Sequence, residues 1–193
     1  MSNWDFFYHN ISQYVTITDE QFNICKSMSF HKRYRKRQYI LQEGEVSKHI
    51  SFIINGATRT YEVDEQGREH ILSFGMEGWW IGHLESFLNE SSSTVNIDCL
   101  ENCEVIHLSK TKREELFRLV QPIETLCRKL VEKATIEHQR RILNKLSKTA
   151  GELYADFIER YPKLEQRIPN HQIASYLGIT PQSLSRIRSQ QDK

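Results

Sequence analysis

The sequence contains no run of about 18 apolar residues, and its start, MSNWDFFYHN, lacks a basic region followed by an apolar one. We therefore expect neither a membrane partner nor a secretory leader. No CxxC pair occurs among the four cysteines, which favours a reduced, cytoplasmic setting. No repeat or low-complexity tract stands out, and 38% hydrophobic residues are enough to bury a core.

Several motifs of catalysis and metal binding are also missing. There is no evident catalytic nucleophile, paired carboxylate site or phosphate loop, so we do not expect an enzyme. Clustered cysteines for an iron–sulfur centre are absent, and no cofactor is predicted. His49, His70, His83 and His107 lie in or near expected strands, but no HxH pair occurs, so no metal site is predicted.

Charge is divided unevenly along the chain. Residues 1–127 carry a net charge of −5 and residues 128–193 a net charge of +6, which together give the overall +1. A basic C-terminal third is compatible with a polyanionic partner, although many solvated helices are equally basic.

Short alternating segments separated by glycine turns follow a helical N-terminal region. That region, the first thirty residues, has a capping box at Thr18 and Gln21. Many short strands over about a hundred residues indicate an antiparallel barrel or jelly roll. Because the helical pattern returns after Ser109, the predicted fold class is α+β, with a first domain over residues 1–120.

Residues 121–147 are predicted to form one long helix. One apolar stripe recurs at steps of three and four residues, at Ile123, Leu126, Leu130 and Ala134. A different stripe follows at Ile142, Leu143 and Leu146. The first stripe suits an ordinary core helix, but the length of the helix and its place after a β domain favour a dimerisation helix.

The stretch IASYLGITPQSLSRIRSQ, residues 173–190, has the spacing of two short helices that cross steeply. Ala174 allows the second helix to approach the first, and Gly178 suits the tight turn between them. Thr180 can cap the second helix, and Pro181 suits its first turn. We therefore predict a helix-turn-helix domain over residues 148–193.

The outer face of the second helix carries amide, hydroxyl and guanidinium groups and no acid. Arginine binds guanine through two hydrogen bonds, glutamine binds adenine, and serine can hold a phosphate. This is the chemistry of a recognition helix in the major groove of double-stranded DNA, although a plain hairpin with a solvated face is the alternative. The predicted DNA-binding residues are Thr180, Gln182, Ser183, Ser185, Arg186 and Gln190.

The order of N-terminal helix, β roll, long helix and helix-turn-helix resembles the Crp/Fnr family of bacterial transcription regulators. The segments ILQEGEVSKHISFIINGATRTYEVDEQGREHILSFGMEGWWIG and IASYLGITPQSLSRIR carry the resemblance, which covers nearly the whole chain. The resemblance implies a cyclic-nucleotide-binding-like sensor domain at residues 1–120, and a homodimer joined along the long helix that contacts DNA and RNA polymerase. It also places Gln182 and Arg186 where such proteins read bases.

The effector cassette departs from the family pattern. Cyclic-nucleotide-binding members carry a Gly-Glu pair, a short helix, and an Arg followed by a small hydroxyl residue, and WIGHLESFLNESSSTVNI aligns with this without gaps. His83 stands in place of the ribose-binding Glu and Ser93 in place of the phosphate-binding Arg, so no cation is left for a phosphodiester. Glu85 would repel a phosphate further if it pointed inward, and we expect cyclic AMP not to bind. The cassette positions are Gly82, His83, Leu84, Glu85, Ser93 and Thr94.

The family's C-terminal wing, a β-hairpin that touches the DNA backbone, has no counterpart before Lys193. Fewer phosphate contacts are therefore expected. Two alternatives remain: a small-molecule-binding or partner-binding β-roll protein with a vestigial helix-turn-helix, and, last, a cupin-like metalloenzyme. The sequence does not identify the effector, the DNA site or the direction of regulation.

Overall fold

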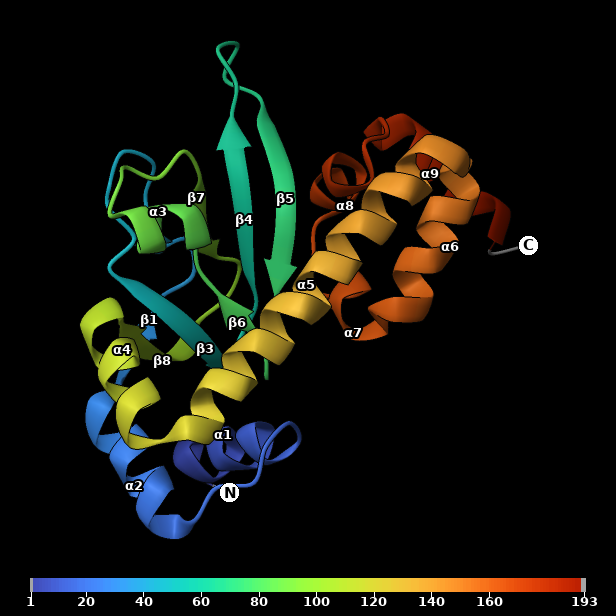
Figure 1. The fold of residues 1–193 in the computed structure, drawn as a ribbon. Helices are drawn as coiled ribbons and strands as arrows, with labels where there is room; N and C mark the ends of the chain where they lie inside the picture. The colour runs from blue at the N-terminus through green and yellow to red at the C-terminus, as the bar shows by residue number, and fades with distance from the viewer. Residues whose placement is uncertain (1, 192–193) are drawn as a thin grey trace. The chain divides into compact units, whose positions relative to one another are not determined.

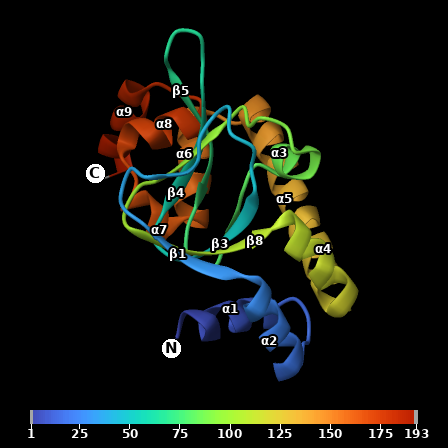
Figure 2. The same cartoon turned by 90° about the vertical axis from the view of Figure 1, so that its left-hand side faces the viewer.

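The computed structural model describes residues 2–191, and its contacts divide the chain into two compact units. The first unit comprises residues 1–60 and 74–133, and the second comprises residues 61–73 and 134–193. The division falls inside the long helix α5 (Gln121–Ser147), which was predicted as a separate middle segment. Figures 1 and 2 show the elements from two directions.

Two four-stranded sheets form the β roll, as the alternating segments predicted. Their strand orders are β1-β8-β3-β6 and β2-β7-β4-β5. The strands are β1 (Phe30–Tyr34), β2 (Tyr39–Leu41), β3 (His49–Asn55), β4 (Thr58–Val63), β5 (Glu69–Gly75), β6 (Trp80–Ile81), β7 (Asn96–Cys99) and β8 (Cys103–Ser109). Strand β8 pairs antiparallel with both β1 and β3, and His107 on β8 therefore lies between Phe30 and Ser51.

The first thirty residues form two helices instead of one, α1 (Asn3–Ser12) and α2 (Asp19–Met28). The predicted capping box of Thr18 and Gln21 is confirmed, and its side chains satisfy N–H groups that a helix start leaves open. The break between α1 and α2 lets both helices reach one core. Together with α4 (Lys110–Leu119) they cover one face of the β1-β8-β3-β6 sheet (Figure 1).

Alternation along β3 and β8 separates the two faces of this sheet, because successive side chains of a strand point to opposite sides. Phe52 and Ile106 belong to the core beneath the helices. Ile53 and Val105 belong to a second core inside the roll. At the other end of these strands, the residues that face the inside of the roll are polar. They are His49, Ser51 and His107, and they line part of a cavity.

The second unit contains the end of α5, the tip of the β4–β5 hairpin and four further helices. These are α6 (Ala150–Arg160), α7 (Pro162–Glu165), α8 (Asn170–Leu177) and α9 (Pro181–Gln191). The buried apolar residues of these helices and their links are Tyr154, Phe157, Leu164, Ile168, Ile173, Ala174, Leu177 and Leu184. Across residues 2–191, no helix combines the length and apolar character needed to span a bilayer.

The hairpin tip is held to α8 by one side chain within this unit. Ser175 Oγ accepts the N–H of Ile71 at 3.0 Å and donates to the carbonyl of Glu69 at 3.0 Å. The hydroxyl thus satisfies both backbone groups that the edge of β5 presents at this point.

Candidate nucleic-acid interface and effector pocket

The turn between α8 and α9 has the local geometry that its residues predicted. Gly178 ends α8 with a φ of 75°, a left-handed conformation that favours glycine. Thr180 Oγ1 accepts the N–H of Ser183 at 3.1 Å, so Thr180 caps the start of α9. Ala174 and Leu184 are fully buried. One face of α9 is therefore packed in the core of the unit, and the opposite face is exposed to solvent.

The open face of α9 carries the predicted DNA-binding residues. Five of them are exposed, Thr180, Gln182, Ser185, Arg186 and Gln190, while Ser183 is half-buried. Within the described part of the chain, the side chains of Gln182 and Arg186 form no hydrogen bond or ion pair. Arg188 differs, because it pairs with Glu165 at 2.6 Å and donates to Asn170, which fastens α9 to its neighbours.

The cassette segment folds around the short helix α3 (Leu84–Asn89). His83 Nδ1 lies 3.0 Å from Ser93 Oγ, so the two residues that replace the glutamate and arginine of the cassette bind each other. Ser93 Oγ also donates to the carbonyl of Val95 at 2.8 Å and accepts the Val95 N–H at 3.1 Å. This buried hydroxyl is fully engaged by the protein, and it carries no charge for a phosphate.

The remaining cassette side chains point away from the roll interior. The side chain of Glu85 is 74% exposed, so the condition under which it would repel a bound phosphate is not met. Leu84 and Thr94 are exposed as well. The six cassette positions therefore do not converge on one cavity.

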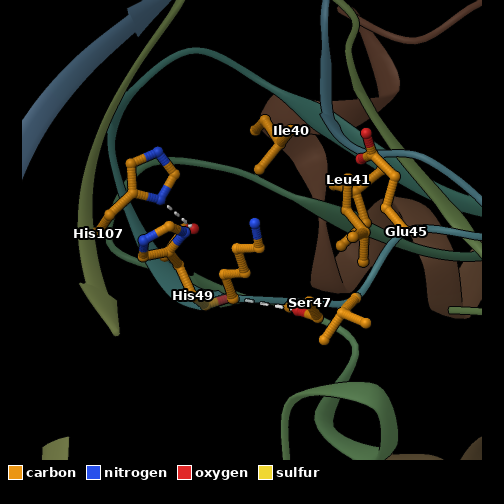
Figure 3. A pocket seen from close by; sticks show the side chains of 11 residues that line it. Ile40, Leu41, Glu45, Ser47, His49 and His107 are labelled. Carbon is orange, nitrogen blue, oxygen red and sulfur yellow. Dashed lines mark hydrogen bonds between the residues drawn. The ribbon is translucent and has the colours of Figure 1, made fainter. Parts of the chain in front are cut away.

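A cavity of about 430 Å³ opens inside the roll, between β2 and β7 of one sheet and β3 and β8 of the other (Figure 3). Its apolar lining consists of Ile40, Leu41, Val46 and Ile97. Its polar lining consists of Glu45, Ser47, Lys48, His49, Ser51 and His107. Of the predicted cassette residues, the cavity touches Gly82 alone.

His107 is fixed at the polar end of this cavity by two hydroxyl groups. Its Nδ1 lies 2.7 Å from Ser51 Oγ, and its Nε2 lies 2.9 Å from the hydroxyl of Tyr34. Burial lowers the pKa of His107 to about 3, and the positive charge of Lys32 acts in the same direction. The imidazole is therefore neutral at pH 7. Burial also lowers the pKa of the neighbouring His49.

The four histidines that the sequence placed in or near strands do not form one cluster. His49 and His107 meet, with ring centroids 5.2 Å apart. His70 binds Asp64 on the hairpin, and His83 binds Ser93. In the range 2–191, no group of three or more His, Cys, Asp or Glu side chains is arranged to hold a metal ion.

The predicted seam of α5 faces the chain's own core in its first half. Ile123 and Leu126 are 4% and 2% exposed and belong to the core under α1, α2 and α4. Leu130 is half-buried against the same core, and Ala134 is exposed. Ile123 and Leu126 are thus already covered within one chain, whereas Ala134 is not.

The second apolar stripe of α5 lies in the second half of the helix. Successive helical residues are 100° apart, so Ile136, two residues after Ala134, falls on the opposite side of the helix. Ile136 and the three residues of the second stripe, Ile142, Leu143 and Leu146, are exposed. Leu143 and Leu146 are 64% and 81% exposed, which is unusual for leucines that recur along one helix face.

Sequence reasoning missed the cavity. The signal was present in β3, where the polar residues His49 and Ser51 precede the apolar run Phe52, Ile53 and Ile54 and line the cavity. Polar residues at positions that should face a core are informative, because burial of a polar group is costly unless it is bonded. Their pairing with His107, more than fifty residues away, is a product of the strand register and is not visible in local spacing.

Comparison with known proteins agrees with this fold. The cyclic nucleotide-binding domain model matches residues 31–119. The chain is 23% identical over 164 residues to the transcriptional activator protein FnrA of Stutzerimonas stutzeri, covering 79% of this chain and 66% of FnrA. It is 26% identical over 87 residues to the cAMP-activated global transcriptional regulator CRP of Salmonella typhimurium, covering 45% of this chain and 41% of CRP. The chain thus spans slightly less than two thirds of FnrA and less than half of CRP.

A solved structure gives the same result for the architecture. FixK2 from Bradyrhizobium japonicum superposes with a TM-score of 0.74 at 20% sequence identity, over 84% of this chain and 83% of FixK2. Similarity at this level of identity establishes the fold.

Proposed function

We propose that the chain is a member of the Crp/Fnr family and a homodimeric regulator of transcription that binds specific DNA sequences. The match to the cyclic nucleotide-binding domain over residues 31–119 and the similarity to FnrA and CRP support the proposal, and the fold agrees with it. One observation carries the proposal. Gln182 and Arg186 lie on the exposed face of α9 with no partner among the described residues, while the opposite face of the same helix is buried. A helix presented in this way can enter a major groove without rearranging its own core.

The side chains of α9 have separate roles in this proposal. Arg186 binds a guanine through two parallel hydrogen bonds, and Gln182 binds an adenine. Ser185 and Gln190 flank them on the exposed face, and the hydroxyls of Thr180 and Ser183 lie at the start of the helix, where backbone phosphates are bound in other such proteins. Contact with RNA polymerase is a prediction that rests on the family resemblance alone.

Dimerisation is proposed to use a seam of α5 that includes Leu143 and Leu146 of the second stripe. Ile136, Gln139, Leu143 and Leu146 follow one another at steps of three, four and three residues, the spacing of a two-helix seam. A second copy of the chain, related by a two-fold axis along this seam, would cover the exposed leucines. It would also supply a second α9 for a near-palindromic site.

Selection from a random pool of double-stranded DNA tests the central proposal. We expect enrichment of a two-fold symmetric site whose half-sites are one duplex turn apart, about 34 Å. The selection is run with and without cell extract, since an effector that alters DNA binding would change the yield. Failure to enrich any sequence at low salt would favour the alternative of a β-roll protein with a vestigial helix-turn-helix.

Arg186→Ala is expected to lower affinity for the selected site by about 5-fold to 150-fold and to relax the preference at one base position of each half-site. The measurement is a binding titration against the site and its single-base variants. Arg186→Lys keeps the charge but loses the two-pronged geometry, so it should also lose the base preference. Lys163→Ala removes an exposed cation from α7 and should leave the base preference unchanged. Unchanged base preference in Arg186→Ala would remove the role given to Arg186.

Cyclic AMP is expected to leave the thermal unfolding temperature unchanged at millimolar concentration, because Ser93 offers no cation and its hydroxyl is already engaged. A ligand at 100 times its dissociation constant would stabilise the protein by about 2.7 kcal/mol, which is easily measured. Adenosine 5′-monophosphate at the same concentration controls for nonspecific effects. A rise in unfolding temperature with cyclic AMP alone would show that the cassette is functional.

A further inference from the structure

We propose that the cavity between the two sheets of the roll binds a small carboxylate with an apolar body, whose anionic end is held by Lys48 and His49. This inference concerns the first unit and does not depend on the proposed binding of DNA. The proposed ligand is a carboxylate, whereas the cassette pattern of the family binds the phosphodiester of a cyclic nucleotide.

The polar wall of the cavity contains both engaged and unengaged groups. Ser51, His107 and Tyr34 bind one another in a chain of hydrogen bonds, so their polar atoms are satisfied by the protein. Lys48 and His49 also line the cavity, and their side chains form no hydrogen bond or ion pair with any residue in the range 2–191. An ammonium and an imidazole N–H are thus left available at one end of the cavity.

The electrostatic environment of that end favours an anion. The charges of Lys32 and Lys48 both lower the pKa of His49, after the larger effect of burial, which shows that two ammonium groups act on this ring. The acid that lines the cavity, Glu45, accepts the N–H of Gln42 at 3.1 Å. Figure 3 shows Glu45 beside Leu41, on the side opposite His49 and His107. A carboxylate held by Lys48 and His49 therefore gains the attraction of the ammonium, while Glu45 lies on the other side of the cavity.

The rest of the cavity selects the body of the ligand. Ile40, Leu41 and Ile97 are apolar residues of the lining, and Figure 3 shows Ile40 and Leu41 across from the two imidazoles. A volume of about 430 Å³ is in the lower part of the range for small-molecule sites, which are mostly apolar with a few placed polar groups. An aryl or branched alkyl carboxylate matches both walls, since its apolar part replaces water and its charge meets the ammonium.

Titration of the full chain with phenylacetate, followed by two-dimensional amide NMR, tests the proposal. We expect saturable shifts centred on Ile40, Ser51 and Ile97 with a dissociation constant of about 1 mM or lower. The neutral analogue 2-phenylethanol has nearly the same shape and should bind at least about fivefold more weakly, because it lacks the charge. Absence of saturable shifts up to about 10 mM, or equal binding of the alcohol, would overturn the proposal.

Two variants distinguish an ion pair between Lys48 and the carboxylate from a general attraction of the anion to a basic surface. Lys48→Gln removes the ammonium in the cavity and should weaken phenylacetate at least about fivefold, while leaving 2-phenylethanol unchanged. Lys36→Gln removes an exposed ammonium from the β1–β2 turn, outside the cavity, and should bind phenylacetate as the parent does. Both residues are exposed, so both variants should fold. Equal affinity in Lys48→Gln and the parent, or an equal loss in Lys36→Gln, would contradict the assignment.

Discussion

Leu143→Lys is expected to convert the proposed dimer into a monomer and to lower its affinity for a two-fold symmetric DNA site by about 100-fold or more. Leu143 is 64% exposed in the single chain and lies in the middle of the second stripe of α5. Burying such a leucine contributes about 1.5–3 kcal/mol, and each dimer would contain two of them. The lysine also places two ammonium groups close to the two-fold axis. Sedimentation equilibrium and a DNA titration measure both effects.

His138→Lys is the matched control, because it adds a lysine to the same helix five residues earlier. His138 is exposed and lies about 140° around the helix from Leu143, outside the proposed seam of Ile136, Gln139, Leu143 and Leu146. This variant should remain dimeric and bind DNA like the parent. The unfolding temperature of both variants at low concentration should be close to that of the parent, since neither side chain belongs to the core. A Leu143→Lys protein that sediments as a dimer would place the interface elsewhere.

Local spacing is not sufficient to predict which face of α5 is buried in the chain's own core. Both stripes of this helix have steps of three and four residues, so either can be a seam. Which stripe enters the chain's own core is decided by α1, α2 and α4, which cover Ile123 and Leu126. Those helices come from distant parts of the chain, and no periodicity within α5 records their presence. The order of elements, in contrast, follows from changes of period and was predicted correctly.

The α8–α9 turn was predictable because each of its requirements is local. Gly178 provides the left-handed backbone, Thr180 provides the cap, and both act within four residues of their own position. The cavity of the roll, in contrast, could not be predicted from local sequence, because its polar wall depends on a hydrogen bond between Ser51 on one strand and His107 on another. Their contact depends on register, which a single sequence does not fix.

The neutrality of His107 is expected to make the protein less stable in acid. The folded protein holds the pKa of this residue at about 3, whereas an unfolded histidine has a pKa of about 6.5. Between these values the unfolded chain binds a proton that the folded chain does not. Each unit fall in pH therefore lowers the free energy of unfolding by about 1.4 kcal/mol, and the fall from pH 7 to pH 5 costs about 2 kcal/mol at this residue.

Urea unfolding of the parent and of His107→Gln at pH 7 and pH 5 measures this contribution. Glutamine can still bond to Ser51 and Tyr34 but does not titrate, so the loss of stability between the two pH values should be about 2 kcal/mol smaller than in the parent. Carboxylates contribute equally to both proteins and cancel in the difference. His9→Gln, at an exposed position on α1, should retain the parent's pH dependence. Equal pH dependence in His107→Gln and the parent would mean that this imidazole accepts a proton while the roll stays folded, and that the polar wall of the cavity can carry a charge.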